Sequence, residues 1–175
     1  MKVRAARLGE VNQIRQLILL SARELSRGHY SDCQIEAAIA HIFGVDTTLI
    51  ADGTYFVAED AGAIQGCGGW SKRRTLFGGD QYESRDAALS DPAVDSAKIR
   101  AFFIHPQFAR QGIGRLLLAR CEAEAKAAGY KSAEPMSTLP GVSFYQACGY
   151  TSGDPTAFVV GDDVEIGFVP MEKML

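Results

Sequence analysis

The stretch IHPQFARQGIGR, residues 104–115, joins a short apolar strand to a long amphipathic helix. The strand is predicted over residues 98–104 and ends in the apolar run from Ala101 to Ile104, which is typical of a central strand covered on both faces. The helix begins after Gly112, ends at Gly129, and is expected to turn five side chains inward: Ile113, Leu116, Leu117, Cys121 and Ala125. The rest of the chain is predicted to pack around this unit.

Hydrophobic periodicity predicts the elements on either side of it. A strand (2–6), two helices (11–25 and 32–44) and a hairpin (55–59 and 64–70) precede it, and a strand (131–136), a helix (140–148) and two strands (150–160 and 164–174) follow. The second helix begins at a capping box, Ser31 to Gln34. Residues 73–97 lack periodicity, which predicts a long loop that is either functional or disordered. This order predicts a mixed α/β (α+β) fold with a central, mostly antiparallel mixed sheet flanked by about four helices.

Glycine and proline mark two special places in the predicted strands. Gly66, Gly68 and Gly69 weaken a strand and are expected where a bulge, another backbone or a ligand comes close, although an irregular strand end explains them equally well. Pro135 cannot donate to a ladder, which predicts an edge position or a strand that splays from its neighbour.

Composition narrows the class of protein. A chain of 175 residues with 47% apolar residues suits one domain, residues 1–175. The net charge of −3 and the scattered Lys and Arg residues argue against nucleic acid or an anionic membrane as partners. The four cysteines form no Cys-x-x-Cys pair, so neither a metal site nor disulfides are expected. Without a long apolar run or a signal-like start, the expectation is a cytoplasmic protein.

Gly112 and Gly114 lie where the strand hands over to the helix. The first amide groups of a helix lack internal partners and carry the positive end of its dipole, so this geometry suits a phosphate, with Arg110 and Arg115 beside it. An ordinary helix start would explain the two glycines about as well. The Walker loop is excluded because Arg115 and Leu116 follow Gly114, and a dinucleotide fingerprint is excluded because Leu117 replaces its third glycine.

Two motifs together resemble the GNAT superfamily of acyl-CoA-dependent N-acetyltransferases. The first is Ile104-x-Pro106-x-x-Ala109-x-x-Gly112-x-Gly114, and the second, about thirty residues later, is SFYQACGY, residues 143–150. The order of predicted elements is similar to the family's topology over essentially the whole chain. The resemblance implies acetyl-CoA as cosubstrate, no metal, and a homodimer as a possible assembly.

The resemblance also implies how coenzyme A is bound. Backbone amides of the loop would hold its pyrophosphate, with contributions from Ala109, Arg110, Gln111, Gly112, Ile113, Gly114 and Arg115. The backbone of residues 102–104 (Phe102, Phe103 and Ile104) would pair with the pantetheine arm as an added strand. Two positions depart from the family pattern: Ala109 replaces a Gln or Arg, and Thr138 or Pro140 replaces an Asn that meets the coenzyme.

By the same resemblance, Tyr145 is the general acid that protonates the leaving thiolate, and the Phe102 amide is the oxyanion donor. The alternative for Tyr145 is ordinary core packing with Phe144 and Tyr150. No general base stands out: a water relay or one of four carboxylates would serve, namely Glu59, Glu83, Glu134 or Glu165. Among the histidines, His105 is predicted to be structural, and His29 and His41 to lie on the surface.

Tyr30 and Trp70 are the candidates for lining an acceptor pocket, although large aromatic residues are more often core. The prediction is a single-domain N-acetyltransferase that transfers acetyl from acetyl-CoA to a primary amine of a small molecule by direct attack. Two alternatives stay open. One is a protein lysine or N-terminal acetyltransferase, and the other is a non-catalytic acyl-CoA-binding regulatory module.

Overall fold

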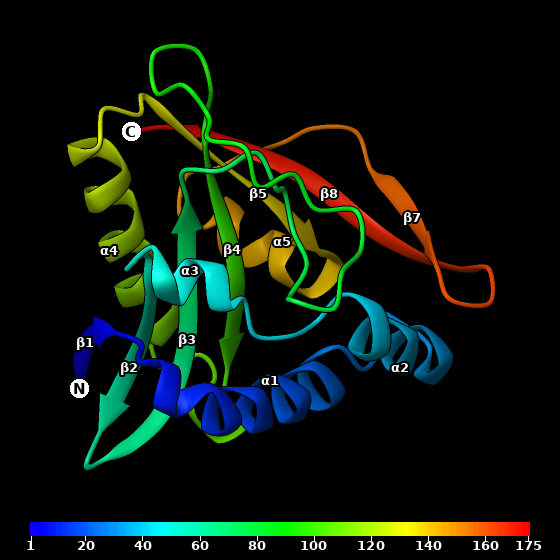
Figure 1. Ribbon diagram of the computed structural model, residues 1–175. Helices are drawn as coiled ribbons and strands as arrows, with labels where there is room; N and C mark the ends of the chain where they lie inside the picture. The colour runs from blue at the N-terminus through cyan, green and yellow to red at the C-terminus, as the bar shows by residue number, and fades with distance from the viewer.

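The computed structural model describes all residues, 1–175, as a mixed sheet covered by helices on both faces (Figure 1). Its strands are β1 (Lys2–Ala5), β2 (Tyr55–Asp60), β3 (Ala63–Ser71), β4 (Ala97–Ile104), β5 (Ser132–Thr138), β6 (Thr151–Ser152), β7 (Thr156–Val160) and β8 (Val164–Met174). The helices are α1 (Val11–Leu25), α2 (Asp32–His41), α3 (Thr47–Ala51), α4 (Ile113–Ala127) and α5 (Val142–Gln146), with 3-10 turns at Leu8–Glu10, Pro106–Phe108 and Leu139–Gly141. None of the helices is both long and apolar enough to cross a membrane.

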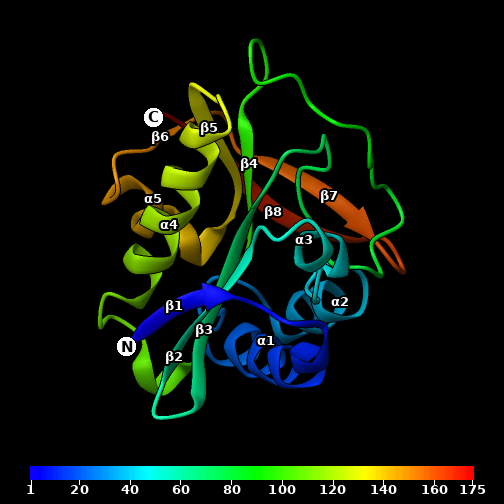
Figure 2. The same ribbon diagram turned by 60° about the vertical axis from the view of Figure 1, so that its left-hand side comes forward.

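The eight strands are ordered β1-β2-β3-β4-β5-β8-β6, and β7 pairs with β8. Only the β4–β5 pair is parallel, so the sheet is mostly antiparallel, as predicted. Helices α1 to α3 cover one face and share one core cluster, and α4 and α5 lie on the other face with a second cluster (Figure 2). The strand β4 is central, which confirms the prediction made from its apolar end.

Local sequence signals account for several element boundaries. The capping box is present: the Ser31 Oγ accepts from the Gln34 amide at 3.2 Å, and the Gln34 Oε1 accepts from the Ser31 amide at 3.0 Å. Gly129 ends α4 with a φ of 97°, a conformation that favours glycine. Helix α3 was not predicted, because five residues show no periodicity; its signal is Asp46, which accepts from the amides of Thr48 and Leu49.

The predicted inner face of α4 is wrong at one position. Leu116 is 50% exposed, whereas Leu118 is buried together with Ile113, Leu117, Cys121 and Ala125. Each residue turns the helix by about 100°, so Leu118 lies beside the stripe formed by the other four and Leu116 lies on its far side. The predicted strand 150–160 is also interrupted, because it divides into β6 and β7.

The parallel pairing of β4 with β5 runs only from Ala97 opposite Ala133 to Ile99 opposite Pro135. Beyond Pro135 the two strands separate, which confirms the expected splay. On its other side β4 has a bulge, marked by a φ of 56° at Ala101 and a register shift against β3. A Cβ at Gly68 would lie 2.7 Å from the ring of Phe102, so this glycine allows a side chain rather than a ligand to approach.

Candidate active site

The space between the separated strands opens into a cavity of about 690 Å³. Its walls come from the end of α1, the residues after α2, the loop 76–79, β4, the start of α4, and the segment from β5 to α5. The central unit of the sequence therefore contributes both a strand and a helix start to one cavity.

The loop before α4 presents a row of unpaired amide groups. None of the six N–H groups from Arg110 to Arg115 donates to another group of this protein. Arg110 and Gly112 have left-handed φ values of 64° and 86°, so the loop curls into the kind of concave row of amides that binds anions. A Cβ at Gly112 would meet nothing within 4 Å, which shows that the loop is open on that side. The geometry that the sequence predicts for a phosphate is present.

Two details refine the predicted loop. The Ala109 amide donates to the Pro106 carbonyl at 3.2 Å, so the free amides begin one residue later than expected. His105 is structural, as predicted, because its Nδ1 accepts from the Gln107 amide at 3.3 Å. Arg115 lines the cavity and donates from Nη2 to the Ala147 carbonyl at 3.1 Å, which links α4 to the residue after α5.

The edge of β4 that faces the cavity spans residues 102–104. Phe102 has no partner on β5 and none on β3, because it lies past the last parallel pair and at the bulge. Phe103 is paired with Cys67 of β3. The Ile104 amide donates to the Ser21 Oγ of α1 at 3.2 Å, so this group already has a partner. Of the predicted pantetheine-pairing residues, Phe102 is the one whose backbone has no ladder partner.

Tyr145 of α5 lies next to Phe102, with ring centroids 6.3 Å apart, and packs against Phe144 and Tyr150. Its side chain is largely buried, yet its hydroxyl makes no hydrogen bond and is not among the polar atoms sealed from solvent. Because Tyr145 lines the cavity, the remaining access of this hydroxyl is to the cavity. Burial raises the pKa of Tyr145 well above its ordinary value. The ring is core, as the simpler alternative held, and the hydroxyl is free.

Tyr30 and Trp70 are not brought to this cavity. The Tyr30 hydroxyl donates to the Gly167 carbonyl at 2.6 Å and accepts from the Leu139 amide at 2.9 Å, and burial raises its pKa to about 12. Trp70 packs against Tyr130 and donates to Glu124 on α4, so it lies on the sheet face opposite to that of Tyr30. Both side chains hold elements together, so the structure gives no support for an acceptor-binding role. Thr138 and Pro140, the two alternatives at the position of the family's Asn, both line the cavity.

No aspartate or glutamate lines the cavity. The four carboxylates considered from the sequence lie elsewhere: Glu59 pairs with Arg4, Glu134 pairs with Lys98, and Glu83 and Glu165 are exposed. His29 is exposed, as predicted, but it also borders the cavity, where it is the one imidazole. His41 is exposed as predicted and lies near Gly161.

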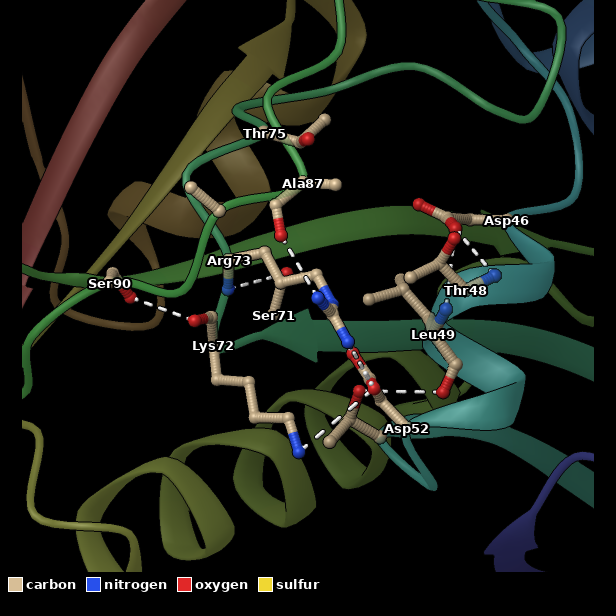
Figure 3. Close-up of polar contacts among 12 residues, drawn as sticks. Asp46, Thr48, Leu49, Asp52, Ser71, Lys72, Arg73, Thr75, Ala87 and Ser90 are labelled. Atoms are coloured by element: carbon tan, nitrogen blue, oxygen red, sulfur yellow. Dashed lines mark hydrogen bonds and ion pairs between the residues drawn. The ribbon is translucent and has the colours of Figure 1, made fainter.

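The loop 73–97 is anchored to the rest of the fold, and its residues 76–79 line the cavity. Arg73 donates to both oxygens of Asp52 and to the Ala87 carbonyl, and Ser90 bonds the Lys72 carbonyl, which closes the base of the loop (Figure 3). Farther along, Phe77 packs in the core against Tyr82, Phe158 and Phe168. Residues 76–79 consequently form part of the cavity wall.

Arg100 was missed by sequence reasoning. It lies on β4 at the point where the strands separate, lines the cavity, and pairs with the buried Asp46 that caps α3. An arginine directly before the apolar end of a central strand is a signal that could have drawn attention to it.

Comparison with known proteins agrees with the geometry. A family model described as Acetyltransferase (GNAT) domain matches residues 51–152, while no curated protein sequence matches the chain. Among solved structures, a GCN5-related N-acetyltransferase from Rhodopseudomonas palustris aligns with a TM-score of 0.74 at 18% identity, covering 99% of this chain and 95% of that one. PaiA N-acetyltransferase from Thermoplasma acidophilum, in complex with coenzyme A, aligns with a TM-score of 0.67 at 15% identity, covering 99% and 98%. A ribosomal-protein-alanine N-acetyltransferase from Brucella melitensis aligns with a TM-score of 0.62 at 15% identity over 100% of both chains. The match over more than half of the sequence and the shared fold place this chain in the GNAT acetyltransferase family.

Proposed function

We propose that this protein transfers an acetyl group from acetyl-CoA to the primary amine of a small molecule by direct attack. The observation that carries the proposal is that one cavity joins three features: the row of free amides at 110–115, the unpaired edge of β4 at Phe102, and the free hydroxyl of Tyr145. Family membership supplies the reaction class, and the coenzyme A complex of the Thermoplasma acidophilum relative supports the cosubstrate.

The cavity fits coenzyme A in shape and charge. The six free amides, together with Arg110 and Arg115, are suited to a pyrophosphate, and the open side of Gly112 leaves room for it. The gap between β4 and β5 could admit an extended arm that pairs with the strand edge at Phe102. A volume of about 690 Å³ is within the usual range for pockets that bury a small ligand.

Acetyl-CoA supplies an acetyl group activated as a thioester. The Phe102 amide is the proposed donor to the carbonyl oxygen, since Phe102 lies beyond the last pair with β5 and at the bulge against β3. The Tyr145 hydroxyl is the proposed proton donor to the departing sulfur. The Tyr145 ring lies near Phe102, so the proposed oxyanion donor and the proposed acid are in the same part of the cavity.

The amine must be neutral when it attacks. For an alkylamine with a pKa near 10.4, removing the proton at neutral pH costs roughly 4 to 5 kcal/mol. Because no carboxylate lines the cavity, the proposed routes for that proton are His29 at its border or a chain of waters. The apolar walls also favour the neutral amine over the charged one.

A small acceptor is favoured by the wall that residues 76–79 and the anchored loop build over the cavity. The alternative acceptor is a protein amine. The structure that supports it is the ribosomal-protein-alanine N-acetyltransferase from Brucella melitensis, which has the same fold. A non-catalytic acyl-CoA-binding module is the third reading, and the lack of a cavity carboxylate is the observation that favours it.

Thiol release separates the three proposals. The protein is incubated with acetyl-CoA and either a panel of small primary amines or a panel of peptides with free N-termini and lysines, while free coenzyme A is titrated. Release with small amines and not with peptides is the expected result. Release with peptides alone would shift the assignment to protein acetylation. Calorimetric binding of acetyl-CoA without release from either panel would favour the non-catalytic module.

A further inference from the structure

Arg100 is a buried cation with most of its hydrogen-bonding groups unused. Its side chain is only 2% exposed, and its Nη2 contacts the Gly78 carbonyl at 2.6 Å and the Asp46 Oδ2 at 2.7 Å. A guanidinium has five N–H donors, and those on Nε and Nη1 donate to no group of the protein. The Nε is sealed from solvent, whereas the Nη1 is not among the sealed atoms. Arg100 is also one of the residues that line the cavity, which leaves Nη1 as its candidate donor toward a ligand there.

The charges around Arg100 leave it without a full counterion. Asp46 is completely buried, and its carboxylate is shared: Oδ1 accepts from Arg85 and from the amides of Thr48 and Leu49. Arg85 has a second partner, Asp80, but the Asp80 side chain is 45% exposed and lies outside the buried group. One buried carboxylate thus faces two guanidinium groups, and no carboxylate lines the cavity itself.

A buried charge with an incomplete set of partners is costly unless a ligand completes it. Burial lowers the pKa of Arg100, although an arginine still keeps its proton at neutral pH. The group that best completes such a site is a carboxylate, because the guanidinium fork matches its two oxygens.

The surroundings of Arg100 describe the rest of the ligand. The cavity wall includes apolar side chains from four different segments, among them Phe43, Leu76, Met136 and Phe168. With no acidic residue present, nothing there would bind a second positive charge. Arg100 precedes Phe102 by two residues, with the bulge at Ala101 between them, which suits an anionic group a few bonds away from the reacting amine.

We propose that Arg100 binds a carboxylate of the acceptor, and that the acceptor is a small amino acid-like amine with an apolar body. This inference rests on the proposed function and adds the class of acceptor to it. Arg100 is then a specificity-determining residue, while the Asp46 carboxylate holds its guanidinium in place.

The first test compares acceptors in matched pairs that differ only in the carboxylate: phenylalanine with phenethylamine, and leucine with 3-methylbutylamine. At saturating acetyl-CoA, the wild-type enzyme should show a kcat/KM at least 10-fold higher for the amino acid of each pair, since hydrogen bonds between two charged groups are stronger than those between neutral groups. Arg100→Gln should abolish this preference through a higher KM for the amino acids and leave the plain amines little changed. Arg85→Gln is the matched control, because it loosens the same ion-pair cluster without lining the cavity, and it should keep the preference.

The second test needs no variant, so it stands even if Arg100→Gln fails to fold. Calorimetry measures binding of N-acetylphenylalanine and of N-acetylphenethylamine to the wild-type enzyme saturated with coenzyme A, and the first should bind at least 10-fold more tightly. Equal affinities, or equal kcat/KM values within each pair, would overturn the carboxylate assignment while leaving acetyl transfer intact. Preferential product binding without any thiol release would instead support the carboxylate site and overturn the proposed transfer.

Discussion

Tyr145→Phe isolates the one group proposed to donate a proton. The substitution removes a hydroxyl that makes no hydrogen bond within the protein and keeps the ring that packs against Phe102, Phe144 and Tyr150. The free energy of unfolding should therefore change by less than about 0.5 kcal/mol. Affinity for acetyl-CoA should also persist, because the free amides at 110–115 belong to another segment.

The expected catalytic loss follows from the role of a general acid. Such a group contributes about 10² to 10⁴ to the rate, so kcat for Tyr145→Phe should fall by that factor, equivalent to about 2.7 to 5.4 kcal/mol of activation free energy. The direction of the pKa shift adds a second expectation. Because burial raises the pKa of Tyr145, the phenol stays protonated through its ordinary titration range, and the wild-type enzyme should not lose activity through Tyr145 below about pH 10.

The assay measures initial rates of thiol release from pH 6 to pH 10, together with calorimetric affinity for acetyl-CoA and a denaturant unfolding curve. Tyr150→Phe is the matched control: its hydroxyl donates to Glu122 at 2.9 Å, so its loss should cost about 1 kcal/mol of stability and little activity. An unchanged kcat in Tyr145→Phe, or an equal loss of kcat and acetyl-CoA affinity, would refute the assignment of Tyr145 as the acid.

Three further predictions concern the loop, the sheet and pH. Gly112→Val should raise the KM for acetyl-CoA at least 10-fold in steady-state kinetics, because Gly112 has a φ of 86° and a side chain would enter the open side of the loop; an unchanged KM would contradict the proposed pyrophosphate site. Gly69→Ala should destabilise the fold by about 1 to 3 kcal/mol, since its Cβ would lie 2.7 Å from the Thr54 carbonyl oxygen. The control Gly9→Ala, whose Cβ meets nothing within 4 Å, should change the free energy of unfolding by less than about 0.5 kcal/mol, and equal unfolding midpoints for the two variants would count against this prediction. The hydrogen bonds from Arg4 lower the pKa of Glu10, so that pair contributes stability above the ordinary carboxyl pKa and loses it as the pH falls; Glu10→Gln should show a weaker drop in stability below about pH 4 than the wild type, and parallel curves would argue against it.

The fold could be predicted because its signals are local. The apolar end of β4, the glycines before α4 and the capping box at Ser31 each specify a neighbouring element without reference to distant residues. Helix α3 and the inward position of Leu118 were missed because their local signals are absent or ambiguous. A five-residue helix has no period to detect, and a run of three leucines leaves the inner face ambiguous by one position.

The phosphate end of the site shares this local character, because consecutive residues build it. The loop 110–115 supplies its own amides, and the two glycines that allow its curl are visible in the sequence. The first free amide follows Ala109, because the Ala109 amide donates to the Pro106 carbonyl and closes a turn. The spacing of the glycines alone does not specify this turn.

The acceptor end is built from segments that are far apart in the chain. Tyr30 and Trp70 have the chemistry of pocket aromatics, yet tertiary hydrogen bonds to Gly167 and Glu124 assign them to the core. Arg100 shows the opposite case. In the sequence it directly precedes the apolar end of a central strand, and only the fold brings Asp46 and the 73–97 loop against it. A charge inside a strand is hence better evidence of a site than an aromatic residue, because burial stabilises the aromatic by itself, whereas the charge needs partners. The partners that this chain supplies to Arg100 are too few, and the carboxylate of an acceptor would complete them.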